Sequence, residues 1–390
     1  MNPPIYRLCA PRKRTKWPGF SKGSGMSAAP TDDRQEKFSG TQDVREAHRF
    51  DVAKLEAYLA ERIDGFETPL EVRQFKGGQS NPTYQLVTPN RKYVLRRKPP
   101  GKLLPSAHAV DREFRIISAL HPTGFPVAKP YLLCEDESII GTMFYVMECV
   151  EGRIYWGPML PDQTPRQRGE IYDAMNETLA HLHGLDYEKL GLSDFGKPGN
   201  YVARQISRWT KQYQASQTET VEEMDRLIEW LPAHLPADER SSIVHGDYRL
   251  DNMILHPTEP KVLAVLDWEL CTIGDPMADF TYHLMQWVMP EGGTGGGTGS
   301  LVNVDLAAMG IPTAEAYTAA YCRRTNRETV PNMDYYAAYN FFRLAGILQG
   351  IVGRVRDGTA SNANAAQNAA AVRPLAERGW YFAKRAGAPG

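Results

Sequence analysis

The chain has 390 residues, of which 42% are hydrophobic, and this is enough for buried cores in two lobes. Its formal net charge of −1 excludes a strong overall field that would draw it to nucleic acid or to an anionic membrane. No apolar run approaches the length of about 20 residues that a membrane-spanning helix needs. Five scattered cysteines without a CxxC pair favour reduced thiols. We therefore expect a cytoplasmic protein that binds neither membrane nor nucleic acid.

The N-terminal segment differs from the rest because six Lys and Arg residues precede the first acid, Asp32. A basic, acid-poor start is typical of an organelle-targeting leader. Prolines at positions 3, 4, 11 and 18 oppose the amphipathic helix of such a leader. We expect residues 1–44 to form a disordered basic tail instead, with Met26 as an alternative start.

Residues 45–150 predict a small lobe rich in β-structure. Apolar residues spaced three and four apart predict helices over 45–63 and 110–120. Alternating or continuous apolar runs predict strands between and after these helices, at 70–75, 83–87, 93–96 and 143–147. Turn residues separate the strands, and a break at Gly152 ends the lobe.

Residues 151–390 predict a larger lobe that is mainly helical. The apolar periodicity predicts five helices here, over 166–185, 201–216, 275–288, 313–325 and 334–357. The fold class is therefore α+β, with a β-sheet N-lobe joined near Val150 to a helical C-lobe.

The strongest motif is HGDYRLDN at 245–252, which is followed by an apolar strand that ends at Asp267. Phosphoryl transfer from a nucleotide needs a carboxylate that orients the accepting hydroxyl and oxygen ligands for magnesium. We assign the first role to Asp247 as general base and the second to Asn252 and Asp267. A single acid in a loop is usually a solvated or capping residue, but this spacing of three groups is rarely met by chance.

Neighbouring residues complete this part of the site. Arg249 is a candidate for neutralising phosphate charge, with a surface arginine as the alternative. His245 is expected to anchor the loop through hydrogen bonds, and Asp279 to reach back and hold the same loop. Only seven residues separate Asp267 from Asp275, which leaves no room for a long peptide-docking segment. A small-molecule hydroxyl acceptor is therefore expected.

A glycine-rich turn between two predicted strands is a candidate for covering nucleotide phosphates. Gly77 and Gly78 allow close approach of backbone N–H groups, and Ser80 and Asn81 add donors. The alternative is an ordinary hairpin, since Gly-Gly is common there.

A cation on the third strand and an acid on the next helix form a second candidate pair for the nucleotide. Arg96 would touch the phosphates while Glu113 holds it in place. Arg97 and Lys98 are alternatives in register, and a surface ion pair of little energetic value is the other interpretation.

The helix 201–216 carries Arg204, Arg208 and Lys211 on one face. This stripe would suit an anionic acceptor such as a carboxylate or a phosphorylated carrier, and a solvated face is the alternative. Further candidates for the acceptor pocket are Tyr155, Trp156, Trp268, Tyr282 and Arg343, although aromatic residues of this kind more often belong to the core.

The motifs together resemble the aminoglycoside phosphotransferase and choline kinase-like superfamily, and most closely the kinase-like domain of acyl-CoA dehydrogenase family proteins. The resemblance covers about 50–385, and its segments are GGQSNPTY, YVLRRKPPG, DREFRIISAL, YVMECVEGR, HGDYRLDNMI, LDWELCTIGDPMADF and FRLAGILQGI. It implies a two-lobed protein-kinase-like fold, ATP and Mg²⁺ as cofactors, Asp247 as base, and Asn252 and Asp267 as metal ligands. Glu148, within YVMECVEGR, joins the nucleotide-binding candidates. Arg96 departs from the lysine of many relatives.

The resemblance also implies an acceptor. A hydroxyacyl group or its CoA thioester is favoured over an antibiotic, whose pocket is normally strongly acidic. Two alternatives stay open: a nucleotide-binding module without catalysis, and an enzyme that transfers AMP instead of phosphate.

Overall fold

A computed structural model describes residues 39–76, 81–99, 109–237, 240–290, 299–358 and 365–390. Residues 1–38 of the predicted tail, and the turn residues Gly77, Gly78 and Ser80, lie outside the described residues. The four cysteines within the described ranges are free thiols, as expected. Across these ranges no helix combines the length and apolarity that crossing a membrane requires.

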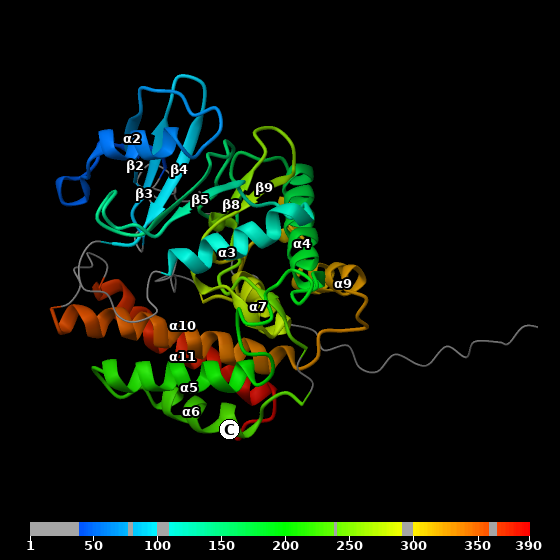
Figure 1. The fold of residues 1–390 in the computed structure, drawn as a ribbon. Helices are drawn as coiled ribbons and strands as arrows, with labels where there is room; N and C mark the ends of the chain where they lie inside the picture. The colour runs from blue at the N-terminus through cyan, green and yellow to red at the C-terminus, as the bar shows by residue number, and fades with distance from the viewer. Residues whose placement is uncertain (1–38, 77–80, 100–108, 238–239, 291–298, 359–364) are drawn as a thin grey trace, which may run out of the picture.

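The small lobe is built on one antiparallel sheet of six strands in the order β1-β2-β3-β4-β6-β5 (Figure 1). Its strands are β1 (Thr41–Gln42), β2 (Glu71–Phe75), β3 (Thr83–Val87), β4 (Lys92–Arg97), β5 (Pro130–Cys134) and β6 (Phe144–Glu148). Successive side chains of a strand point to opposite faces. Phe144 and Val146 therefore pack against α2 (Val52–Ala60). Tyr145 faces the other way, toward the core that includes α3 (Val110–Leu120).

The large lobe is mainly helical (Figure 1). Its longer helices are α4 (Pro165–Gly184), α5 (Tyr201–Ser216), α6 (Glu222–Ala233), α7 (Pro276–Leu284), α9 (Ala314–Arg324), α10 (Met333–Arg356) and α11 (Ala365–Arg385). α10 and α11 lie side by side, with α5 against α10 and α6 against α11. The large lobe also contains two small antiparallel pairs of strands. They are β7 (Ser242–Val244) with β10 (Thr272–Gly274), and β8 (Met253–Leu255) with β9 (Val262–Val265).

The chain between the lobes is fastened to β8. The backbone N–H groups of Arg153 and Leu255 each donate to the other residue's carbonyl at 2.8 Å. A Cβ atom at Gly152 would lie 2.2 Å from the Leu255 carbonyl oxygen. This position therefore requires glycine because the two backbones approach so closely.

The predicted two-lobed α+β fold is confirmed, and several elements differ in extent. Strand 83–87 and helix 201–216 have the predicted bounds. The helix expected over 45–63 is shorter, because Asp51 caps α2 by accepting the Lys54 N–H at 3.0 Å. The helix expected over 275–288 ends at Leu284 and continues as a 3₁₀ turn to Trp287. β1, β5, α6 and α11 were not predicted.

Candidate active site

The segment between β7 and β8 is held in place from two sides. His245 donates through Nε2 to the Leu266 carbonyl at 2.8 Å, so it anchors the loop as predicted. The Asp279 carboxylate accepts the backbone N–H groups of His245 at 2.7 Å and Gly246 at 2.9 Å. Gly246 has φ +83°, and a Cβ there would lie 3.0 Å from Leu270, which favours glycine at this bend. These bonds fix the backbone immediately before Asp247.

Both carboxylate oxygens of Asp247 have partners. Oδ1 accepts the Tyr282 hydroxyl at 2.6 Å and pairs with Arg249 Nε at 3.0 Å. Oδ2 accepts the Asn252 amide N–H at 3.1 Å. Burial raises the pKa of Asp247, but the Arg249 guanidinium and the Tyr282 hydroxyl outweigh it and lower that pKa below its ordinary value. Asp247 is therefore an ionised, oriented carboxylate at neutral pH.

Asn252 and Asp267 lie on adjacent backbone segments. The Leu266 N–H donates to the Asn252 carbonyl at 2.8 Å, which places Asp267 next to Asn252. The Asn252 amide nitrogen donates to the Asp247 carbonyl oxygen at 2.9 Å as well as to its carboxylate, so its side-chain oxygen is left as a ligand atom. Asp267 adopts φ +64° and ψ +61°. A left-handed conformation at a residue other than glycine is sparsely populated and is concentrated at functional sites.

Arg96 connects the N-lobe to this site. Its Nε lies 3.0 Å from Glu113 Oε2, and its Nη2 lies 2.6 Å from Asp267 Oδ1. The Glu113 carboxylate also accepts the Asn81 amide at 2.9 Å and the Tyr145 hydroxyl at 3.1 Å. The side chains of Arg96 and Glu113 are 11% and 2% exposed, so the interpretation as a surface ion pair is wrong.

Residues 71–339 match the family model described as "Phosphotransferase enzyme family". The chain belongs to this family. Its sequence is 46% identical over 348 residues to acyl-CoA dehydrogenase family member 10 of Mus musculus and 43% identical over 358 residues to member 11 of Homo sapiens. Each alignment covers 89% of this chain, but only 32% and 45% of the relative. The chain thus spans less than half the length of these curated relatives.

Solved structures give the same family assignment. A protein of Ralstonia eutropha, provisionally assigned as an aminoglycoside phosphotransferase, is 51% identical with a TM-score of 0.79, covering 86% of this chain and 99% of that one. Aminoglycoside phosphotransferase APH(4)-Ia, solved with ADP and hygromycin B, is 14% identical with a TM-score of 0.55, covering 86% and 100%. The second likeness shows the shared fold alone.

Two further candidate residues of this family member are Arg249 and Glu148. The Arg249 side chain is 16% exposed, and its guanidinium bridges Asp247 and Asp251, with Nη2 3.3 Å from Asp251. Glu148 lies exposed at the end of β6, where it contacts the backbone of Lys129 at 3.4 Å. No described contact joins Glu148 to the other site residues.

Two residues of the basic stripe on α5 make contacts within the protein. The Arg204 guanidinium donates to the carbonyls of Gly199 and Lys197. The Arg208 guanidinium lies 5.2 Å from the centre of the Trp209 ring. Arg204 therefore orders the chain before α5, and its share in an acceptor site is correspondingly reduced.

Two contacts of the site were not predicted. Tyr282 was expected to line the acceptor pocket, yet its hydroxyl binds the proposed base. The available signal is that Tyr282 follows Asp279 by three residues, so a helix places both on one face. Glu269, 3.8 Å from Arg96 Nη2, adds another acid beside Asp267.

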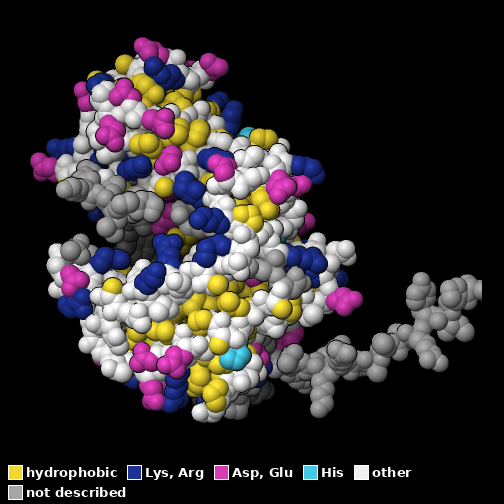
Figure 2. All heavy atoms as spheres, turned by 60° about the horizontal axis from the view of Figure 1, so that its bottom comes forward, with side chains coloured by type: hydrophobic (Ala, Val, Ile, Leu, Met, Phe, Trp, Pro, Cys, Tyr) yellow, Lys and Arg dark blue, Asp and Glu magenta, His cyan; other side chains and the backbone are white. Residues whose placement is uncertain are grey.

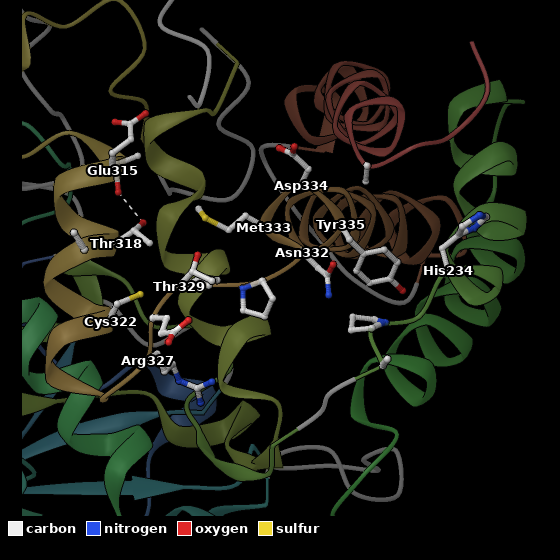
Figure 3. A pocket seen from close by; sticks show the side chains of 18 of the residues that line it. His234, Glu315, Thr318, Cys322, Arg327, Thr329, Asn332, Met333, Asp334 and Tyr335 are labelled. Atoms are coloured by element: carbon white, nitrogen blue, oxygen red, sulfur yellow. Dashed lines mark hydrogen bonds between the residues drawn. The ribbon is translucent and has the colours of Figure 1, made fainter. Parts of the chain in front are cut away.

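A cavity lies elsewhere, in the large lobe (Figure 3). It measures about 1500 Å³ and lies between the end of α6, α9 and the start of α10. His234, Cys322 and Tyr335 are among its lining residues, and none of the candidate site residues is.

Proposed function

We propose that the protein transfers the γ-phosphate of ATP, with Mg²⁺, to a hydroxyl group of a small metabolite. The observation that supports this most is that Asp247, Asn252 and Asp267 lie close together and that Arg96 pairs with Asp267. Phosphoryl transfer depends on positioning and on charge stabilisation, and this set supplies both. Membership of the phosphotransferase family supports the same reaction class.

Asp247 orients the accepting hydroxyl in this proposal. Because its pKa is low, it accepts a hydrogen bond from the hydroxyl and takes the proton late, as the bond to phosphorus forms. Tyr282 and Arg249 hold one oxygen, and Asn252 holds the other. The carboxylate therefore has little rotational freedom, which lowers the entropy cost of aligning the acceptor.

The oxygen donors present fit magnesium. Across the described residues, no group of three or more His, Cys, Asp or Glu side chains could hold a metal ion by itself. Mg²⁺ typically takes only one or two carboxylates and completes its shell with phosphate oxygens and water. Asp267 and the side-chain oxygen of Asn252 would hold it here, where it would neutralise charge on the nucleotide phosphates. Arg96 would add a forked cation for the same phosphates.

The proposed acceptor is a hydroxyacyl group or its CoA thioester. The curated relatives are named as acyl-CoA dehydrogenase family members, which supports an acyl compound. α5 contains three basic residues, Arg204, Arg208 and Lys211, and no Asp or Glu. Figure 2 shows Lys and Arg side chains gathered beside a hollow between the lobes. A polycationic aminoglycoside would be repelled by such a surface, whereas an anionic acceptor would be attracted.

The test incubates the protein with ATP, Mg²⁺ and a panel of hydroxy acids and their CoA thioesters, and then identifies products by mass. A gain of one phosphate on a hydroxyacyl compound, lost in Asp247→Ala, is the expected result. A gain of AMP would support the AMP-transferring alternative. Thermal stabilisation by ATP without any product from the panel would support the non-catalytic alternative.

A further inference from the structure

A buried chain of polar groups connects α9 to the segment that carries the proposed base. The Tyr321 hydroxyl on α9 lies 2.7 Å from His183 Nδ1, in the last turn of α4. His183 Nε2 lies 3.2 Å from Asp279 Oδ2 on α7. The same carboxylate accepts the backbone N–H groups of His245 and Gly246. Tyr321 is fully buried, and the side chains of His183 and Asp279 are each 1% exposed.

The chemistry of the groups sets the direction of these bonds. The hydrogen bonds from His183 and the His245 backbone lower the pKa of Asp279 despite its burial, so the carboxylate is ionised and only accepts. Burial raises the pKa of Tyr321, so its hydroxyl keeps its proton. In a neutral imidazole, Nε2 must therefore carry the proton for Asp279, and Nδ1 must accept from Tyr321.

We propose that Tyr321 is a positioning residue for the phosphotransfer reaction. Its hydroxyl donates to Nδ1 of His183 and, together with the Asp279 carboxylate that accepts from Nε2, fixes the imidazole ring between α9 and α7. Asp279 in turn fixes the two backbone amides that precede Asp247. The effect on rate rests on the proposed function, whereas the hydrogen bond at Nδ1 and the backbone order do not depend on it.

Loss of this hydroxyl would disturb every later step of the chain. In Tyr321→Phe, Nδ1 would be buried without a donor. The proton would stay on Nε2, because moving it to Nδ1 would satisfy no partner and would leave an Nε2 lone pair facing the Asp279 carboxylate. The His183 ring would then be held at one nitrogen only, and the Asp279 carboxylate to which it donates would be oriented less tightly. A small displacement of the backbone before the base is enough to lower a rate by about 10- to 100-fold.

Tyr317, on the same helix, provides the matched control that separates the proposed role of Tyr321 from a purely structural one. Tyr317 lies one turn earlier, is also buried, and like Tyr321 stacks on Phe280, with ring centres 6.2 Å apart compared with 3.9 Å. Its hydroxyl has no hydrogen-bond partner among the described residues. Tyr317→Phe therefore removes the same atom from the same face of α9 without removing a hydrogen bond.

The experiment compares Tyr321→Phe with Tyr317→Phe in the full chain. Three measurements are made: kcat and KM for ATP, the His183 ring-nitrogen resonances by ¹⁵N NMR of histidine-labelled protein, and amide exchange at His245 and Gly246. We expect Tyr321→Phe to lower kcat by about 10- to 100-fold with little change in KM. We also expect a shift of the Nδ1 resonance, because that nitrogen loses its hydrogen-bond donor, and faster exchange at the two amides. Tyr317→Phe should change none of the three.

A second variant, His183→Gln, tests the same chain of hydrogen bonds independently. His183→Gln removes the imidazole ring that Tyr321 holds while keeping a side-chain amide N–H for Asp279. In this background, Tyr321→Phe should lower kcat no more than Tyr317→Phe does, which is the coupling expected of residues in one chain.

Equal kcat, Nδ1 resonance and amide exchange in Tyr321→Phe and Tyr317→Phe would overturn the proposal. If the Nδ1 resonance and the exchange change as expected but the wild-type protein phosphorylates no acceptor, the proposed function has failed and the hydrogen-bonded chain stands.

Discussion

Replacement of Arg96 by Met should destabilise the protein strongly, because it leaves a buried carboxylate without its cation. Glu113 is only 2% exposed, and Arg96 Nε is its ion-pair partner at 3.0 Å. Removing one partner of a buried pair typically costs about 3–5 kcal/mol. The second contact, to the one-third exposed Asp267, is better solvated and adds less. We therefore expect the free energy of unfolding of Arg96→Met to fall by about 3–5 kcal/mol.

Urea denaturation at pH 7 and 25 °C measures this change. Arg166→Met is the control, because Arg166 is 88% exposed and pairs with Glu170 on the helix surface, a contact worth at most about 0.5 kcal/mol. Adding Glu113→Gln to Arg96→Met should recover most of the loss, since no buried charge then remains. A loss in Arg96→Met no larger than in Arg166→Met would refute the reasoning.

The sign of the pH dependence follows from Glu113. Burial raises its pKa above the unfolded value in spite of Arg96. A carboxyl with a raised folded pKa contributes stability that is present below the unfolded pKa and is lost as pH rises through the folded pKa. Without Arg96 this pKa rises further. The deficit of Arg96→Met should therefore shrink as the pH is lowered toward the point where Glu113 is protonated.

Further substitutions test individual parts of the site. Asp247→Ala should lower kcat by about 10²–10⁴-fold with the fold intact, measured by phosphate transfer and circular dichroism. Asp267→Ala should raise the Mg²⁺ concentration needed for ATP binding, measured by calorimetry, and unchanged Mg²⁺ dependence would contradict its role as ligand. Tyr282→Phe removes a bond that lowers the pKa of Asp247, so the acidic limb of the kcat/KM profile should move to higher pH. Gly246→Ala should cost about 1–2 kcal/mol of stability, because φ is +83° there.

Local pattern was enough to predict much of the fold. Alternation predicts strand 83–87 and helical periodicity predicts helix 201–216, and both predictions match the observed bounds. The patterns are clear because each segment buries one face against a neighbour. α6 and α11 contain Pro232 and Pro374, and a proline inside a helical pattern argues against the helix. Both nevertheless form, α6 packed against α11 and α11 against α10. Tertiary packing overrides propensity there.

The candidate site was predictable in its parts but not in its contacts. The order of residues in HGDYRLDN indicates which groups share a loop. The contact between Arg96 and Asp267 joins positions 171 residues apart, and that between Tyr282 and Asp247 joins positions 35 apart. A single sequence does not show that these side chains touch, because the contacts arise from how α7 and the two lobes pack.

The fastening of the interlobe connection to β8 determines where this connection passes from one lobe to the other. At Arg153 the chain is bonded to Leu255 in both directions, so this stretch belongs with the large lobe. The sheet of the small lobe extends to Glu148, whose N–H donates to the Lys129 carbonyl at 2.8 Å. The backbone bonding of the connection therefore changes from the small lobe to the large lobe across residues 149–151, directly after the end of β6.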